Sequence, residues 1–136
     1  MTERATEQDL AWTRAGKVRA RLTDTGGLEV GVDGLTTQAK YYKPLLKEFF
    51  RKSFPAARPR WGDFHVHIVM EHVGDPPHMD LDNLAKAMLD SVVGACFHDD
   101  SQVARLLVER VEADREGVYM RVEPAGSRVA QHMPRG

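Results

Sequence analysis

The chain has 136 residues and a mass of 15.3 kDa, which favours one domain over two and is long enough to bury a core. Hydrophobic residues make up 42% of the sequence and charged residues 29%, which excludes wholesale disorder, and no apolar run approaches the roughly 18 residues of a membrane span. The single cysteine, Cys96, excludes an intrachain disulfide and a zinc site built from several thiolates. We expect Cys96 to be a small buried apolar residue of a protein in the reducing cytoplasm.

The net charge of −1 conceals an uneven distribution along the chain. Residues 1–60 hold 12 Lys and Arg against 7 Asp and Glu, whereas residues 61–136 hold 7 against 13. The basic residues concentrate in residues 40–60 and the aspartates in residues 75–100. A basic segment beside an acidic pocket suits a polyanionic substrate attacked at a metal site, but two segments that neutralise each other would have the same composition.

The first half of the chain alternates between strand and helix patterns. Apolar residues recur at every second position in residues 18–22 and 28–32, on either side of a Gly-rich turn, which predicts a hairpin. Leu45, Leu46, Phe49 and Phe50 recur at helical spacing and predict a helix over residues 44–53. A half-buried strand is predicted over residues 61–73, with Phe64, Val66, Ile68 and Met70 on its apolar face.

The second half predicts one more helix and two more strands. The helix runs from about residue 80 to residue 93 and ends at Gly94, and strands follow over residues 103–112 and 118–123. We expect the last two strands to form a hairpin around a turn at residues 114–117. The predicted fold is an α+β layer, in which two helices pack on one face of a small mixed sheet.

Domain boundaries follow from the same patterns. We expect a flexible lead-in over residues 1–13, one folded domain over residues 14–123, and a flexible tail over residues 124–136.

The aspartates of residues 80–100 carry the most specific chemical signal. Asp80 and Asp82 are two apart, so their carboxylates point the same way in an extended lead-in to the helix. Asp82, Lys86 and Asp90 then follow at helical spacing. Carboxylates about 5 Å apart repel by roughly 3 kcal/mol at an effective dielectric near 20, so a convergence with Asp100 would need protonation, Lys86 or a cation to offset it. Oxygen ligands without cysteine favour magnesium or manganese, although a solvated helix cap and a loop turn remain the alternative.

The order of these residues resembles a known family signature. The pattern D-x-D-N-L-x-K begins at Asp80, and D-D-x-Q-V begins at Asp99. Over roughly residues 64–123 the chain resembles the RusA family of phage-derived Holliday-junction resolvases, which are small, homodimeric, magnesium-dependent DNA endonucleases.

The resemblance implies particular roles for these residues. Catalytic, metal-binding carboxylates would be Asp80, Asp82 and Asp100, and the essential lysine would be Lys86. Asp90 and Asp99 match further acidic positions. The family also implies an α+β subunit, a Mg²⁺ cofactor that Mn²⁺ can replace, and a two-fold dimer that binds a four-way DNA junction.

Several other residues have a functional and a structural interpretation. His65 and His67 share a strand face at a spacing that can chelate a metal, but a polar sheet face explains them equally. Trp61 and Tyr41 either stack on unpaired bases or are core or edge aromatic residues. His78 and His98 flank the aspartates and either contact phosphate or are ordinary loop residues. Basic residues that either grip phosphates or form a solvated face are Lys40, Lys43, Lys47, Arg51, Lys52, Arg58 and Arg60.

The sequence therefore predicts a Mg²⁺-dependent, structure-specific endonuclease that resolves Holliday junctions and branched DNA in recombination and repair. Two other classes stay open. One is a dimeric junction-binding module that does not cut, and the other is a metal-dependent hydrolase of small phosphoesters.

Overall fold

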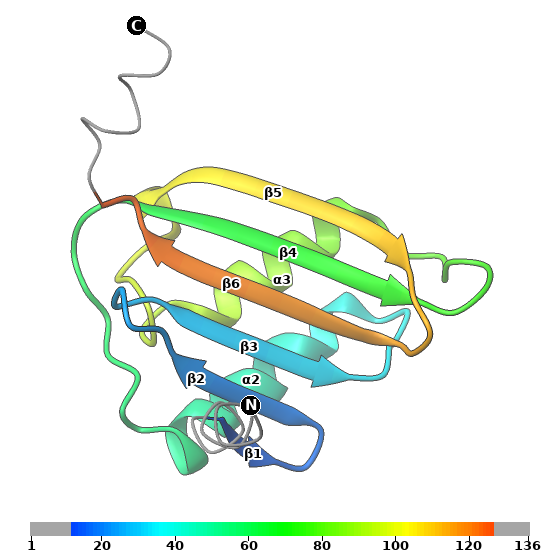
Figure 1. Ribbon diagram of the computed structural model, residues 1–136, viewed down its shortest axis with the longest axis horizontal. Coiled ribbons are helices and arrows are strands. Elements are labelled where there is room, and N and C mark those ends of the chain that lie inside the picture. The colour runs from blue at the N-terminus through cyan, green and yellow to red at the C-terminus, as the bar shows by residue number, and fades with distance from the viewer. Residues whose placement is uncertain (1–11, 127–136) are drawn as a thin grey trace, which may run out of the picture.

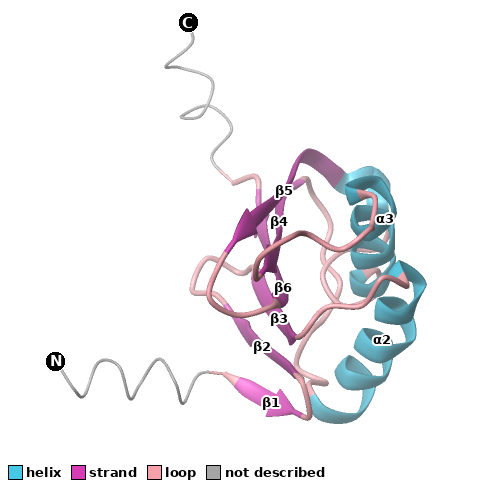
Figure 2. Ribbon diagram, turned by 90° about the vertical axis from the view of Figure 1, so that its right-hand side faces the viewer, coloured by secondary structure: helices cyan, strands magenta, loops and turns pink. Residues whose placement is uncertain are grey.

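The computed structural model describes residues 12–126, which form one six-stranded mixed sheet covered on one face by two helices (Figures 1 and 2). The strands are β1 (Thr13–Ala15), β2 (Val18–Leu22), β3 (Leu28–Asp33), β4 (Phe64–His72), β5 (Val103–Glu112) and β6 (Gly117–Pro124). The helices are α2 (Tyr42–Ser53) and α3 (Leu81–Val92), with short 3₁₀ turns η1 (Ala39–Tyr41) and η2 (Asp100–Gln102). The predicted α+β class and the placement of both helices on one face are confirmed, whereas the predicted lead-in and tail lie mostly outside the described residues.

The strand order is β1-β2-β3-β6-β4-β5, and only β4 and β5 run parallel. The first hairpin, β2–β3, forms as predicted. β1 was not predicted, because three residues are too few to show an alternating pattern; it adds an antiparallel strand beside β2. Trp12, just before it, stacks over the guanidinium groups of Arg19 and Arg21.

The prediction that the last two strands pair as a hairpin is wrong. β6 follows β5 after a short turn, yet it lies between β3 and β4, and β5 pairs with β4 on the far side. The difference follows from burial. β6 buries Val118, Met120 and Val122 and gains a neighbour on each side, whereas β5 is mostly exposed and suits an edge. A helical crossover from β4 also delivers β5 parallel to β4, which leaves β6 to pair antiparallel with β4.

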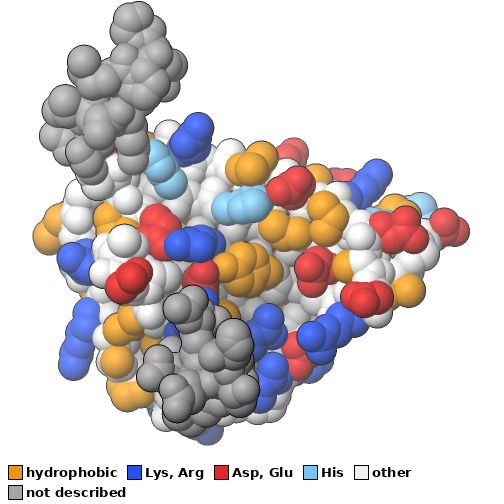
Figure 3. Space-filling model, in the orientation of Figure 1, with side chains coloured by type: hydrophobic (Ala, Val, Ile, Leu, Met, Phe, Trp, Pro, Cys, Tyr) orange, Lys and Arg blue, Asp and Glu red, His pale blue; other side chains and the backbone are white. Residues whose placement is uncertain are grey.

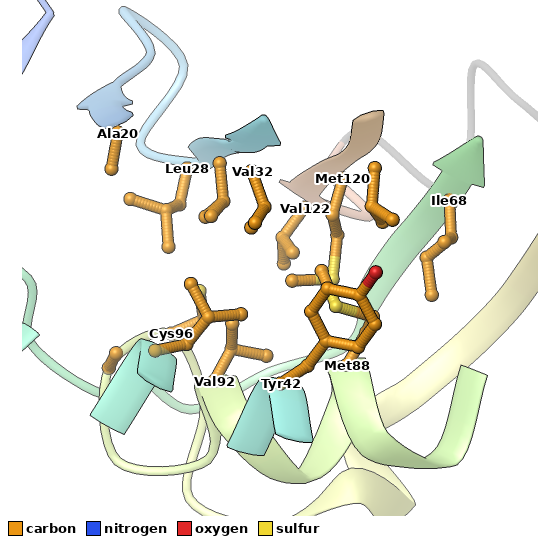
Figure 4. Packing of buried hydrophobic residues seen from close by; sticks show 14 of the residues in the cluster. Ala20, Leu28, Val32, Tyr42, Ile68, Met88, Val92, Cys96, Met120 and Val122 are labelled. Carbon is orange, nitrogen blue, oxygen red and sulfur yellow. The ribbon is translucent and has the colours of Figure 1, made fainter. Parts of the chain in front are cut away.

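The core lies between the sheet and the two helices (Figure 4). β4 alternates strictly between buried and half-buried residues, as its pattern predicted. Cys96 is 5% exposed and lies in this core, as expected, and burial raises the pKa of its thiol. Tyr42 and Met88, from the two helices, point into the same cluster as Ile68 and Met120 of the sheet.

The other face of the sheet carries both basic and acidic side chains (Figure 3), and one carboxylate on it is buried. Glu29 of β3 is 3% exposed and accepts hydrogen bonds from Arg21 Nε at 2.6 Å and Tyr119 Oη at 2.8 Å. Arg121 Nη1 lies 3.2 Å from the same carboxylate. Burial raises the pKa of Glu29, but the bonds from Tyr119 and Arg21 and the two positive charges outweigh it, so the pKa falls below its usual value. Burial and the bond to Glu29 raise the pKa of Tyr119 to about 12.

Glu29→Gln should lower the free energy of unfolding at pH 7 by about 2 kcal/mol, because the charge-assisted bonds from Arg21 and Tyr119 lose their negative acceptor, while the partly exposed Arg21 and Arg121 keep some contact with water. The folded pKa of Glu29 lies below its unfolded value of 4.5, so the stabilisation is fully present above that pH and is lost as the pH falls through the folded pKa. Urea unfolding from neutral pH into acid should therefore show the two proteins converge. A stability difference that stays constant with pH would contradict this account.

Candidate functional site

Two exposed aspartates stand at the beginning of α3. Asp80 occupies the N-cap position with extended backbone angles, and its carbonyl accepts the Leu84 N–H at 3.1 Å, but its side chain makes no capping bond. Asp82 lies in the first turn and is also exposed. Within residues 12–126 neither carboxylate has a hydrogen-bond or ion-pair partner, so both are free to bind a ligand from solution. The positive end of the α3 dipole reduces the cost of placing two negative charges here.

The second acidic pair, Asp99 and Asp100, is fixed by the side chain of Gln102. The buried Gln102 amide donates to the carbonyls of Arg60 at 2.9 Å and Gly62 at 2.8 Å. Its Oε1 accepts the backbone N–H of His98 at 2.8 Å and of Asp99 at 3.1 Å. The side chain of Gln102 therefore bonds the loop before β5 through its oxygen and the segment before β4 through its nitrogen, and so joins the two.

Asp99 and Asp100 differ in what their side chains do. Asp99 caps η2 by accepting the Ser101 N–H at 2.9 Å, and its hydrogen bonds with Ser101 lower the pKa of its carboxyl. Asp100 is exposed and has no partner among the described side chains. Asp99 is therefore a structural cap, and Asp100 is the free carboxylate of the pair.

The two acidic pairs lie at opposite ends of the sheet. In the parallel β4–β5 pairing, Phe64 faces Val103 at one end and His72 faces Glu112 at the other. α3 runs behind the sheet from the His72 end to the Val103 end (Figure 1), and its 12 residues span about 18 Å. No group of three or more His, Cys, Asp and Glu in residues 12–126 is placed to hold a metal ion. The expected convergence of Asp80, Asp82 and Asp100 within one chain is thus not found, because a rigid helix separates them.

Two of the charged residues that follow one another at helical spacing along α3, Lys86 and Asp90, line an open groove of about 450 Å³. Lys40 and Lys43, from η1 and the start of α2, line the groove opposite Lys86 and Asp90 of α3. Lys86 is exposed and Asp90 half-buried. Three lysines therefore line one groove, and one of them, Lys86, lies one to two helical turns along α3 from Asp80 and Asp82.

Most of the other predicted basic residues are engaged within the chain. Arg51 and Lys52 both pair with Glu48, at 2.9 and 2.7 Å. Lys47 Nζ donates to the carbonyl of Val93 at 2.6 Å, and burial, with the charge of Lys43, lowers its pKa. Arg60 donates to the carbonyl of Gly26. Arg58 lines a smaller hollow beside Arg60.

The histidines and exposed aromatic residues have separate surroundings. His67 contacts Glu109 at 2.7 Å on the open sheet face, and neither it nor His65 belongs to a group that could hold a metal within residues 12–126. Trp61 is 75% exposed and stacks on His98 with ring centroids 3.9 Å apart. Trp61 is therefore not a core residue, and its partner His98 is next to Asp99 in the chain. Tyr41 is 40% exposed.

Comparison with known proteins identifies the family. The family model for endodeoxyribonuclease RusA matches residues 12–123. The chain belongs to the RusA family. Its members are Holliday-junction resolvases, so the chain is a nuclease of the class that acts on branched DNA. No curated protein matches the chain, and no described helix is long and apolar enough to cross a bilayer.

The RusA match extends the sequence resemblance, which began near Phe64, to Trp12 and so takes in the first hairpin and α2. Sequence reasoning did not single out Gln102 as a positioning residue. Its signal was present, because an amide three residues after Asp99 fits a capping box.

Gln102→Leu should lower the free energy of unfolding by about 2–3 kcal/mol, because it leaves several buried backbone groups without partners. Asp100→Asn, two residues away, is the matched control and should change stability by less than about 0.5 kcal/mol. Urea unfolding of the two variants measures the difference. Equal stabilities would show that Gln102 does not hold this loop.

Proposed function

We propose that this RusA-family chain is a Mg²⁺-dependent endonuclease that resolves four-way DNA junctions in recombination and repair and acts as a homodimer. Asp80 and Asp82 bind the metal with Asp100, and Mn²⁺ can replace Mg²⁺. The observation that carries the proposal is the pair of exposed, unpartnered carboxylates at the start of α3, beside a groove lined by three lysines. Family membership supports the reaction, the free carboxylates at the start of α3 support Asp80 and Asp82, and the assignment of Asp100 rests on the family resemblance.

The donor set fits a hard divalent cation. Asp80 and Asp82 offer only oxygen atoms, are exposed, and have no internal cation to neutralise them within the described chain. When bound, Mg²⁺ polarises the phosphodiester and lowers the pKa of a coordinated water. Lys86, one helical turn beyond Asp82, is placed to stabilise the negative charge that develops on the phosphate.

The lysine groove and the Trp61–His98 stack suit the two parts of a branched DNA substrate. Lys40, Lys43 and Lys86 face one groove and provide positive charge for a phosphate backbone. Trp61 offers an exposed ring face, and aromatic faces of this kind stack on unpaired bases.

One observation favours a second function, a dimeric junction-binding module that does not cut. A single chain separates Asp100 from Asp80 and Asp82 by the length of α3, so one copy alone lacks three converging carboxylates. Such a module would bind four-way junctions and leave them intact in Mg²⁺.

Asp82→Asn should abolish cutting of a labelled synthetic four-way junction in Mg²⁺, a loss of at least 100-fold, because it removes a metal-binding charge. Junction binding in Ca²⁺ should persist. Asp24→Asn, a change to an exposed aspartate of the β2–β3 turn, is the control and should cut like the wild type. If Asp82→Asn cuts normally, Asp82 is not a catalytic residue; if the wild type binds but never cuts, the non-cleaving module is correct.

Lys43→Gln should weaken junction binding and reduce the slope of log K against log salt concentration by about 0.7–0.9, because one phosphate contact is lost. Lys52→Gln is the matched control. Its charge lies on the same helix but is paired with Glu48, so its removal should leave the slope unchanged. Fluorescence anisotropy at several salt concentrations gives both slopes. If Lys43→Gln leaves the slope unchanged, the groove is not part of the DNA-binding surface.

A further inference from the structure

Trp61 is the most exposed large hydrophobic side chain of residues 12–126, at 75% exposed. Its indole ring stacks on the imidazole ring of His98, with the ring centroids 3.9 Å apart and the ring planes inclined by 17°. His98 therefore covers one broad face of the indole, and the high exposed fraction leaves the other face open to a second ring. Indole rings that are fixed on one side and wet on the other are typical of binding surfaces.

The backbone holds the two rings together. Arg60 and Phe97 form a parallel bridge, and Trp61 and His98 are the next residues along the two bridged segments. The Gln102 side chain donates to the carbonyls on either side of Trp61 and accepts the N–H of His98, so one buried amide fixes both segments. The ring pair is thus a rigid platform before any ligand binds, and a rigid group loses little conformational entropy on binding.

The other exposed aromatic rings are less open than that of Trp61. Tyr41 is 40% exposed, and Lys17 Nζ lies 5.3 Å from the centroid of its ring. Trp12 is half-buried, and two guanidinium groups stack over its ring. Trp61 therefore offers the widest open aromatic surface within residues 12–126.

The charges on the Trp61 segment suit a nucleic acid. Arg58 and Arg60 precede Trp61 in an exposed part of the chain, and within residues 12–126 neither has an ion-pair partner. Arg60 donates to the carbonyl of Gly26, which leaves its positive charge unneutralised. Both charges are therefore available to phosphate groups. Positive charge beside an open aromatic face is the combination by which proteins bind unpaired nucleotides.

The ring pair also lies close to one carboxylate of the candidate site. His98 and Asp100 are two residues apart, which limits their separation along the chain to about 7 Å. Bases in a nucleic-acid strand follow one another at about 3.4 Å per step. A base stacked on Trp61 therefore belongs to a nucleotide within about two steps of a phosphate held at Asp100.

We propose that Trp61, supported by His98 and positioned by Gln102, binds an unpaired nucleobase beside the phosphate that is cut, and that this contact makes the protein prefer branched DNA to continuous duplex. Bases inside a duplex are stacked on one another and cannot reach the ring, whereas an unpaired base at a branch point can. The role in choosing the substrate rests on the proposed nuclease function, whereas the binding of a base does not.

Base binding is tested in Ca²⁺, without cutting. Trp12→Phe leaves Trp61 as the only tryptophan, so its fluorescence reports on the platform alone. A single-stranded oligonucleotide of about eight deoxyadenosines, added up to millimolar concentration, should quench this fluorescence through stacking. An abasic oligonucleotide of the same length keeps the phosphates and lacks the bases, so it should leave the fluorescence unchanged. Quenching by both oligonucleotides, or by neither, would overturn the platform.

The affinity for branched DNA is tested with Trp61→Ala. This variant should bind a four-way junction with unpaired adenines at its centre about 5- to 100-fold more weakly, and its binding of duplex should stay within about twofold of the wild type. The slope of log K against log salt concentration should not change, because no phosphate contact is lost. Trp61→Phe should bind the junction within about threefold of the wild type.

Tyr41→Ala is the matched control for an exposed aromatic residue, and it should leave the ratio of junction affinity to duplex affinity unchanged. A Trp61→Ala protein that keeps the wild-type ratio would show that Trp61 does not recognise the branch.

The supporting role of His98 is tested by rescue. His98→Ala removes the ring behind Trp61 and should weaken binding of the deoxyadenosine oligonucleotide at least threefold. His98→Phe keeps an aromatic ring and removes the ring nitrogens, and it should restore the affinity. If His98→Phe binds as weakly as His98→Ala, His98 acts on the DNA through its nitrogens and does not support Trp61.

Cutting separates this proposal from the nuclease proposal. In Mg²⁺, Trp61→Ala should lose at least fivefold of the wild-type preference for cutting the junction over duplex. Asp82→Asn, in the Trp12→Phe background, should lose cutting and keep the fluorescence response to the oligonucleotide. If the wild type does not cut, the nuclease proposal fails, and the fluorescence response still decides whether Trp61 binds a base. If Trp61→Ala cuts with the wild-type preference, the platform does not choose the substrate.

Discussion

The rigid crossover from β4 through α3 to β5 is the constraint on which the arrangement of this molecule depends. Parallel neighbouring strands cannot be joined by a tight turn, so the chain must return along the sheet before β5 begins. α3 makes this return and buries Leu84, Met88 and Val92 against the sheet. Whatever precedes α3 and whatever follows it are therefore held at opposite ends of the domain. The two acidic pairs are the residues at those two positions.

The local structure was largely predictable from sequence because its signals are local. The alternation of β4 and the apolar stripes of α2 and α3 each follow from one short window of residues, and all three elements form where they were expected. Strand pairing is not local. The turn between β5 and β6 suggested a hairpin, but which strand takes the central position is decided by competition for burial across the whole sheet, and β6 is the strand whose alternate residues Val118, Met120 and Val122 are buried.

The candidate site was predictable as a set of residues but not as a geometry. The order of Asp80, Asp82, Lys86 and Asp100 carried the family resemblance, and the family match agrees with it. A shared metal site of the three carboxylates was implied by the family resemblance, and within one chain a helix of 12 residues separates Asp100 from the other two. The basic segment shows the same limit. The sequence shows how many charges the segment has. It does not show that Arg51 and Lys52 pair with Glu48, because that depends on side-chain contacts.

The separation of the aspartates also lowers the electrostatic cost of folding a single chain. Three carboxylates brought within about 5 Å would repel by roughly 3 kcal/mol per pair at an effective dielectric near 20, a total comparable to the stability of a small domain. In the single chain Asp100 stands a helix length from Asp80 and Asp82, and all three face solvent, so this cost does not arise during folding.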